Sequence, residues 1–100
     1  MANTVKKLSR AAVATSEGTI YTVPALTTAV VTNIVLTNTT ATAITATVKL
    51  ATFSVLDTIT IAANGVFAFD LRQVLDTTET IRAAASATGL NVHISGMEIA

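Results

Sequence analysis

Apolar and polar residues alternate along most of this chain, and a period of two is the pattern of a β-strand with one buried face. The clearest example spans residues 29–50, where two alternating runs flank a threonine-rich connection at residues 38–42. β-branched residues dominate both runs, which favours strands over helices. Because a connection of this length suits a hairpin, we predict a central β-hairpin. Its buried face is predicted to hold Val30, Thr32, Ile34, Leu36, Ile44, Ala46, Val48 and Leu50.

Similar runs predict further strands at residues 11–16, 19–23, 57–62, 66–71, 78–87 and 90–99, with a break at residues 51–56. Pro24 ends the second of these strands because proline cannot donate to a sheet ladder. Asn64-Gly65 lies between two alternating runs and predicts a second hairpin, in which both central turn residues have positive φ.

Two places depart from the alternation. Val74 and Leu75 are adjacent apolar residues at helical rather than strand spacing, so residues 72–76 are predicted to form a single helical turn. Met97 and Ile99 fall on the opposite parity to the run before them, which requires a one-residue shift near Gly96. A glycine at such a place predicts a β-bulge.

The complete pattern predicts an all-β fold: a single antiparallel β-sandwich, jelly-roll-like, with a short N-terminal arm. The sandwich domain is expected to cover residues 11–100 and the arm residues 1–10. On size scaling, a chain of 100 residues buries about two-thirds of its unfolded surface. Because aromatic residues are only 4% of the chain, the core must come from Val, Ile, Leu and Ala.

The N-terminal arm is the candidate interface. It is polar and basic with few apolar anchors, and such a terminus is by default flexible or extended. Its basic side chains could lie across an acidic neighbour, and a solvated tail is the alternative. The candidate interface residues are Val5, Lys6, Lys7, Leu8 and Arg10.

The exterior is unusually poor in charge. Charged residues are 12% of the chain, about half the usual share of roughly 25%, and 6 basic residues balance 6 acidic ones. Threonine supplies most of the remaining polarity. A soluble monomer normally carries more charge, whereas interface cores are depleted in it. We therefore predict that partners cover much of the exterior; a small threonine-rich monomer is the alternative.

Composition also argues against several partners. A nucleic-acid-binding protein would show a basic stripe, and no segment reaches the ~20 apolar residues that span a bilayer. We therefore expect neither nucleic acid nor membrane as a partner. With no cysteine there is no disulfide and no thiolate zinc site, which suits assembly in a reducing cytoplasm. The first residues lack the apolar run of a signal peptide, so we expect them in the mature protein.

No residue pattern carries recognisable catalytic chemistry. His93 is the only histidine and has no cysteine to share a metal with. The serines lie in no nucleophile-elbow context. Asp57, Asp70 and Asp76 sit at predicted strand ends, where solvated turn residues are common. The Phe residues are predicted to face inward, so Tyr21 is the one aromatic left as a sugar-binding platform. We predict no enzyme, no catalytic residue, no metal and no cofactor.

Four segments together resemble a family of small all-β structural proteins of tailed bacteriophages. They are Val23-Pro24-Ala25, Val31-Thr32-Asn33-Ile34-Val35-Leu36-Thr37-Asn38, Val74-Leu75-Asp76-Thr77-Thr78-Glu79-Thr80-Ile81-Arg82 and Ile94-Ser95-Gly96-Met97-Glu98-Ile99. The resemblance begins at Tyr21, so it does not cover the first twenty residues. The corner departs from the family pattern, because Thr78-Glu79 stands where such proteins commonly have Gly-Asp.

The resemblance implies a virion component that is assembled in the host bacterial cytoplasm. The favoured expectation is a capsid cement or decoration protein: a homo-oligomer, expected to be a trimer, that binds the major capsid protein and stabilises the assembled head. The first alternative is a tail, baseplate or fibre-adaptor protein. The second is a carbohydrate- or receptor-binding module.

Overall fold

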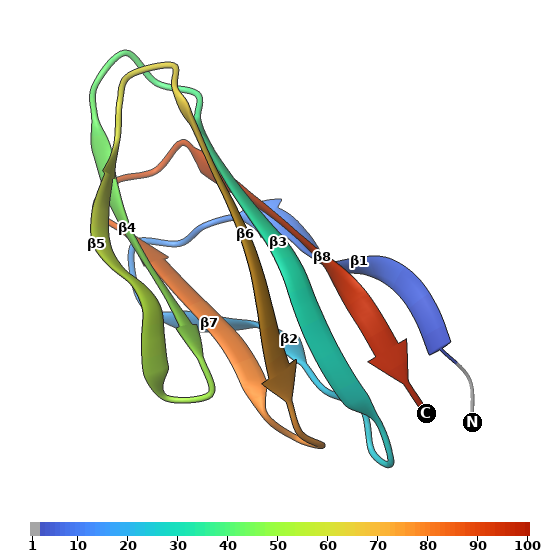
Figure 1. The fold of residues 1–100 in the computed structure, drawn as a ribbon. Coiled ribbons are helices and arrows are strands. Elements are labelled where there is room, and N and C mark those ends of the chain that lie inside the picture. The colour runs from blue at the N-terminus through green and yellow to red at the C-terminus, as the bar shows by residue number, and fades with distance from the viewer. Residues whose placement is uncertain (1–2) are drawn as a thin grey trace.

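The computed structural model describes residues 3–100, apart from the side chains of Asn3 and Lys6. Its strands are β1 (Asn3–Ala12), β2 (Gly18–Thr22), β3 (Thr28–Asn38), β4 (Ile44–Leu50), β5 (Phe53–Ile61), β6 (Val66–Leu75), β7 (Thr80–Ala85) and β8 (Leu90–Ile99). They form two antiparallel four-stranded sheets, sheet A in the order β1-β8-β3-β6 and sheet B in the order β2-β7-β4-β5 (Figure 1). This strand order is that of a jelly roll. It confirms the predicted fold class.

The jelly roll is one long hairpin folded over on itself. Four of its strand pairs are β1–β8, β2–β7, β3–β6 and β4–β5, assigned alternately to the two sheets. The tip of the hairpin is the connection between Leu50 and Phe53, which pair directly across Ala51 and Thr52. Ala51 reverses the chain there with a positive φ of 59°. The sequence pattern assigned this tip to a break between strands.

Both predicted hairpins are wrong, because each connects strands of different sheets. β3 lies in sheet A and β4 in sheet B, and the same is true of β6 and β5. In the second connection Asn64 does have a positive φ of 54°, and the Gly65 N–H donates to the Ala62 carbonyl at 2.9 Å. Alternation shows that a strand has one buried face, but it does not show which strand lies beside it.

Asn38, at the end of β3, explains why the chain crosses between the sheets there. Its side chain is 1% exposed. Nδ2 donates to the carbonyls of Thr42 (2.8 Å) and Ile61 (3.1 Å), and Oδ1 accepts from Thr40 N (2.9 Å) and Thr40 Oγ1 (2.7 Å). The amide thus fills its full capacity of two donated and two accepted bonds. It ties the β3–β4 connection to the end of β5, in the opposite sheet.

Sheet A bends along a line of irregularities at one level. Opposite Ser95 of β8, β1 carries the extra residue Leu8 and β3 carries the extra residue Thr32. The extra residue in β3 reverses its parity, so Val31 is buried and Val30 faces outward. The predicted inward positions of Val30 and Thr32 are therefore wrong, while those of Ile34, Leu36 and the four residues of β4 hold.

Gly96 lies at this bend, as predicted, but the bulges are in its neighbours. β8 alternates without interruption, with Ile94 and Gly96 buried and Met97 half-exposed. A Cβ on Gly96 would lie 2.1 Å from the Val30 carbonyl oxygen and 2.9 Å from Leu8 Cδ1. Glycine is needed here because the bulged strands on both sides close over the position.

Two further predictions are corrected at the sheet edges. Residues 72–75 belong to β6 and not to a helical turn; Val74 looked helical because it is an apolar residue on the outer face beside the buried Leu75. Residues 3–10 lie in β1, which pairs with β8 along its length, so the proposed boundary at residues 10–11 falls inside a strand. Met1 and Ala2 lie outside the described residues.

The core is aliphatic, as the composition predicts. The accessible surface is 5373 Å², against roughly 15,000 Å² for an unfolded chain of this mass, so about two-thirds is buried. Among the largest fully buried side chains are Ile34, Leu36, Ile44, Leu75, Ile81, Leu90 and Ile94. Thr27 is the only buried threonine of the described part of the chain, so threonine does supply the exterior polarity.

Candidate functional site

The outer face of sheet A is a regular surface of four strands. Strand register arranges its residues in rows that cross all four strands. One row is Val5, Met97, Val30 and Val74; the next is Lys7, Ser95, Asn33 and Asp70; the third is Arg10, His93, Val35 and Ala68; the last is Ala12, Asn91, Thr37 and Val66. An apolar row therefore lies beside a polar row, and the charged residues are on the two edge strands.

The structure divides the predicted interface residues between two faces. Val5 is 78% exposed and lies with Lys7 and Arg10 on the outer side of β1. Leu8 is 7% exposed and belongs to the core. The side chain of Lys6 is outside the described part. The surviving candidates are one apolar and two basic residues along a sheet edge, and Arg10 pairs with His93 of β8.

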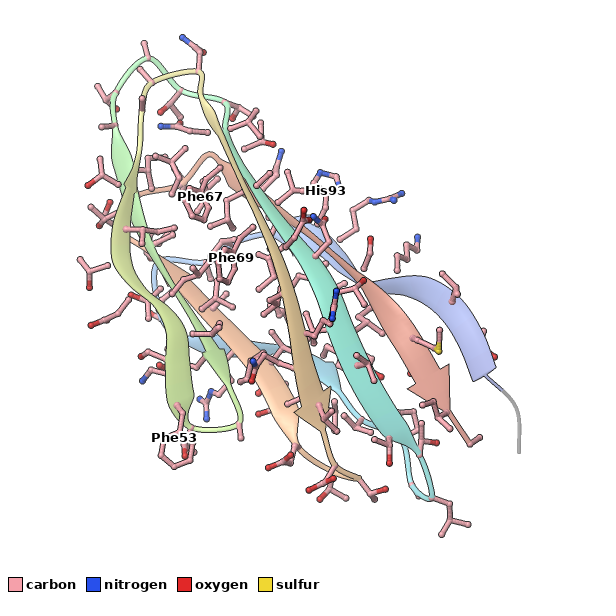
Figure 2. All side chains as sticks on the ribbon, viewed as in Figure 1. Phe53, Phe67, Phe69 and His93 are labelled. Atoms are coloured by element: carbon pink, nitrogen blue, oxygen red, sulfur yellow. The ribbon has the colours of Figure 1, made fainter. Side chains whose placement is uncertain are left out.

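Four of the five large apolar residues that are exposed in residues 3–100 lie at the end of the sandwich where β1 begins and β8 ends, and Val66 lies at the other end. The four residues concerned, with their exposed fractions, are Leu26 (91%), Phe53 (78%), Val5 (78%) and Val74 (62%). Register places them at this end, since Val5 and Val74 share a row near the ends of their strands, Phe53 begins β5, and Leu26 lies in the loop before β3. Figure 2 shows Phe53 beside the β4–β5 turn, away from Phe67 and Phe69.

A groove of about 430 Å³ opens between the start of β5 and the end of β6. Its walls include Leu50, Phe53, Val55 and Val74, and its polar groups are those of Ser54, Gln73 and Glu79. Glu79 already accepts a hydrogen bond from Asp76 N at 2.7 Å through Oε1. The groove is therefore lined by polar and apolar groups together.

Sequence reasoning missed this apolar end for a specific reason. The Phe residues were taken to face inward, which holds for Phe67 and Phe69, whose ring centroids lie 6.3 Å apart, but not for Phe53. Phe53 shares a row with buried Ile81, yet β5 is an edge strand and nothing covers it from the described part of the chain. The exposure of Val74 was missed because residues 72–76 were predicted to form a helical turn. Only the three-dimensional pairing brings these residues together.

Several titratable side chains link strands to one another or to a loop. Tyr21 is half-buried and its hydroxyl donates to Glu98; burial and this hydrogen bond raise the pKa of Tyr21 above its ordinary value. On the outer face of sheet B, Glu17 Oε1 lies 2.7 Å from Lys49 Nζ, and Glu17 Oε2 lies 3.2 Å from Arg82 Nε. The hydrogen bond from Lys49 lowers the pKa of Glu17.

The arrangement offers exposed surfaces on which other molecules could bind. No group of three or more His, Asp or Glu side chains that could hold a metal ion occurs in the described residues. Tyr21 is half-buried and its hydroxyl donates a hydrogen bond to Glu98, so its ring is not fully exposed as an aromatic platform. Within residues 3–100 there is also no helix long and apolar enough to cross a membrane.

The sequence was compared with protein-family models and with curated proteins. The chain matches no protein-family model. A search of curated proteins finds no similar sequence.

Proposed function

We propose that the protein is a structural component of a bacteriophage virion, and specifically a capsid cement protein that binds the assembled head shell as a symmetric oligomer. The observation that carries this proposal is the surface. It is poor in charge and rich in threonine, and four of its five exposed large apolar side chains lie at one end. Exposed apolar residues scattered singly are ordinary, but a group of them indicates an interaction site. The resemblance to phage structural proteins supplies the partner.

Stabilisation would follow from mass action. A protein that binds the assembled shell and not its separate subunits shifts the equilibrium towards the shell. Many symmetric copies add their weak contacts through multivalency. Neither effect needs a catalytic group, so the chemistry available in the described residues is sufficient for this function.

The fold supports the proposal only by analogy. Jelly rolls occur in viral capsid proteins, in lectins and in cupins, and a fold does not determine a function. Two observations favour the first class over the second: Tyr21 is tied to Glu98, and Phe53 is a lone aromatic at its surface. A tail or baseplate role uses the same kind of surface and is separated from a head role by copy number.

Attachment to shells depleted of the chain tests the proposal. Purified chain is added to such particles, and the bound amount is measured by sedimentation. Saturation at a stoichiometry that matches the shell lattice is the expected result, and Phe53→Ser and Leu26→Ser should weaken binding because both side chains are exposed on the apolar end. Ala63→Ser, at an exposed site at the opposite end, is the matched control. Absence of binding by the unmodified chain would refute the proposal.

A further inference from the structure

We propose that Leu26 anchors the contact with the shell: its side chain inserts into an apolar pocket of a shell protein, and basic groups surround that pocket. This inference deepens the proposed function and rests on it for the choice of a shell protein as the partner. The evidence is the exposure of Leu26, its backbone conformation, the hydrogen bonds that fix its loop and the carboxylates beside that loop.

Leu26 combines an exposed apolar side chain with a strained backbone. It lies in the turn between β2 and β3 and is 91% exposed, the largest fraction among the exposed large hydrophobic residues of the described chain. Its φ is 57°, in the left-handed region, where the Cβ of an L-residue crowds the backbone. The other described residues with positive φ, apart from glycine, carry no large apolar side chain: Ala51, Thr58, Asn64 and Thr78.

The fold gains little from a leucine at this position. Almost none of its side chain is buried, so it adds little apolar burial to the core. Glycine would accept the same φ without strain. A strained residue that the fold does not need is characteristic of a contact site. The exposed side chain of Leu26 is therefore the strongest single candidate for contact with a partner.

Hydrogen bonds to the β6–β7 connection fix both ends of the loop. At its start, Val23 N donates to the Glu79 carbonyl at 2.9 Å, and Thr78 N donates to the Val23 carbonyl at 3.1 Å. At its end, Thr27 N donates to Thr77 Oγ1 at 3.1 Å, and the same hydroxyl donates to the Thr27 carbonyl at 2.7 Å. Figure 1 shows the β2–β3 loop and the β6–β7 connection at the same end of the molecule.

The segment between these two ends has little conformational freedom. Only Pro24, Ala25 and Leu26 lie between Val23 and Thr27, and the ring of Pro24 restricts its own φ. Thr27 is 8% exposed, and its hydroxyl donates to the Ala25 carbonyl at 3.1 Å. A loop that is already fixed loses less entropy when it binds. Leu26 is therefore preorganised for insertion into a partner.

The carboxylates of the β6–β7 connection indicate the charge of the partner. Asp76 directly precedes Thr77, and Glu79 follows in the same connection. Neither carboxylate forms an ion pair among the described residues. Glu79 Oε1 accepts a hydrogen bond from Asp76 N at 2.7 Å, which leaves both negative charges in place. Complementary charges steer association and fix orientation, so the matching pocket has a basic rim.

Two substitutions of Leu26 separate the contact from the strain. Binding of the full chain to shells depleted of it is measured by sedimentation, and folding by thermal melting. Leu26→Gly should weaken binding by about tenfold or more, while its melting temperature should not fall, because glycine accepts a positive φ. Leu26→Met keeps a large apolar side chain and should bind nearly as tightly as the natural chain.

Thr58→Gly is the matched control for strain relief. Thr58 also has a positive φ, of 49°, and is exposed on β5. This variant should keep its binding to shells. Equal loss of binding in Thr58→Gly and Leu26→Gly would show that the effect comes from the backbone and would overturn the inference.

The hydroxyl of Thr77 tests whether the fixed loop matters. Thr77→Val removes both hydrogen bonds to Thr27 but leaves the Leu26 side chain in the chain, so binding should weaken by several-fold. Thr77→Ser keeps the hydroxyl and should bind as the natural chain does. Natural binding by Thr77→Val would contradict preorganisation of the loop.

Charge reversal at Asp76 tests the basic rim. Asp76→Lys should weaken binding at low salt, and the difference from the natural chain should shrink as salt screens the charges. An unchanged or tighter interaction would contradict a basic pocket.

The outcomes separate this inference from the proposed function. If Leu26→Gly binds shells as tightly as the natural chain does, the inference fails and the proposed function stands. If Leu26→Met loses as much binding as Leu26→Gly, an apolar pocket is contradicted. If the natural chain binds no shells, the proposed function fails, and the inference fails with it.

Discussion

The buried amide of Asn38 should be the most sensitive polar group of the fold. Asn38→Ala removes two donated and two accepted hydrogen bonds at a position that is 1% exposed. The Thr42 carbonyl keeps a donor, since Thr40 Oγ1 lies 2.9 Å away. The Ile61 carbonyl and Thr40 N lose their Asn38 partners. Two groups are therefore left short of a hydrogen bond, the Ile61 carbonyl at a buried position and Thr40 N at a partly buried one.

The magnitude follows from those two groups. Each buried polar group without a partner costs about 1–3 kcal/mol, so the free energy of unfolding should fall by about 2–6 kcal/mol. A chain of this size has a total of about 5–15 kcal/mol. With a urea m-value of about 2 kcal/mol/M, the midpoint of unfolding should fall by roughly 1–3 M. The m-value itself should stay unchanged, because the fold is kept.

Equilibrium unfolding in urea, followed by far-UV circular dichroism, measures this loss. Asn33→Ala is the matched control: Asn33 is on the same strand, and its amide donates one exposed hydrogen bond to Asp70 at 2.8 Å. It should cost about 0.5 kcal/mol or less, as an exposed polar pair does. Equal losses in the two variants would refute the assignment of Asn38 as the tie between sheets.

Asn38→Asp separates hydrogen bonding from packing, since the side chains have the same shape. A carboxylate would face the Thr42 and Ile61 carbonyls without a proton to donate, which raises its pKa in the folded state above the unfolded value. The penalty should be complete above the folded pKa and should shrink as the pH falls towards the unfolded pKa. A loss that does not change with pH would contradict this reasoning.

Three further predictions concern single positions. Gly96→Ala should lower the free energy of unfolding by more than about 3 kcal/mol or prevent folding, because the added Cβ would lie 2.1 Å from a carbonyl oxygen of β3. Gly18→Ala is the control: its Cβ would have no neighbour nearer than 4.0 Å, so this variant should melt within a few degrees of the natural chain. Thr78→Gly should raise the free energy of unfolding by about 1 kcal/mol, since a β-branched residue at a φ of 70° is strained, and an unchanged urea midpoint would contradict this. Glu17 has a pKa below its ordinary value, so its contribution to the free energy of unfolding is present above the unfolded pKa and is lost as the pH falls through the folded pKa. Glu17→Gln should therefore reduce the loss of thermal stability in acid, measured by melting at pH values above and below these two pKa values. A pH profile identical to that of the natural chain would count against the ion pair with Lys49.

Local structure was readable from the sequence where one strand face is buried. The alternation identified both faces of β4, β7 and most of β8, because the buried apolar residues of each strand share one parity. It failed at Val30 and Thr32, where an extra residue in β3 reverses the parity. A bulge leaves no mark of its own in a run of Val and Thr.

Pairing was harder to predict than strands. Asn64-Gly65 is a strong turn signal, yet the turn serves an arch between sheets as well as it serves a hairpin. The real hairpin tip, at Ala51 and Thr52, has neither glycine nor asparagine. Asn38 is the residue that selects the arch, and its role depends on the Ile61 carbonyl, 23 positions away.

The interaction surface was predictable only in part. The basic residues of the N-terminal segment were found from composition, and two of them do lie exposed along an edge strand. Phe53, Leu26 and Val74 were missed, because exposure at an edge depends on which strand has no neighbour. The low charge of the chain was the one sign in the sequence for the proposed contact surface.

We propose that the chain is a repeated component of a virion shell. The number of copies of the chain in each purified particle tests this proposal. Quantitative mass spectrometry gives the ratio of this chain to the major capsid protein in virions of the phage that carries its gene. We predict a simple ratio that matches the symmetry of the shell, with many copies per particle. A few copies per particle would contradict a cement role and indicate a tail component, and complete absence from the particle would contradict the whole account.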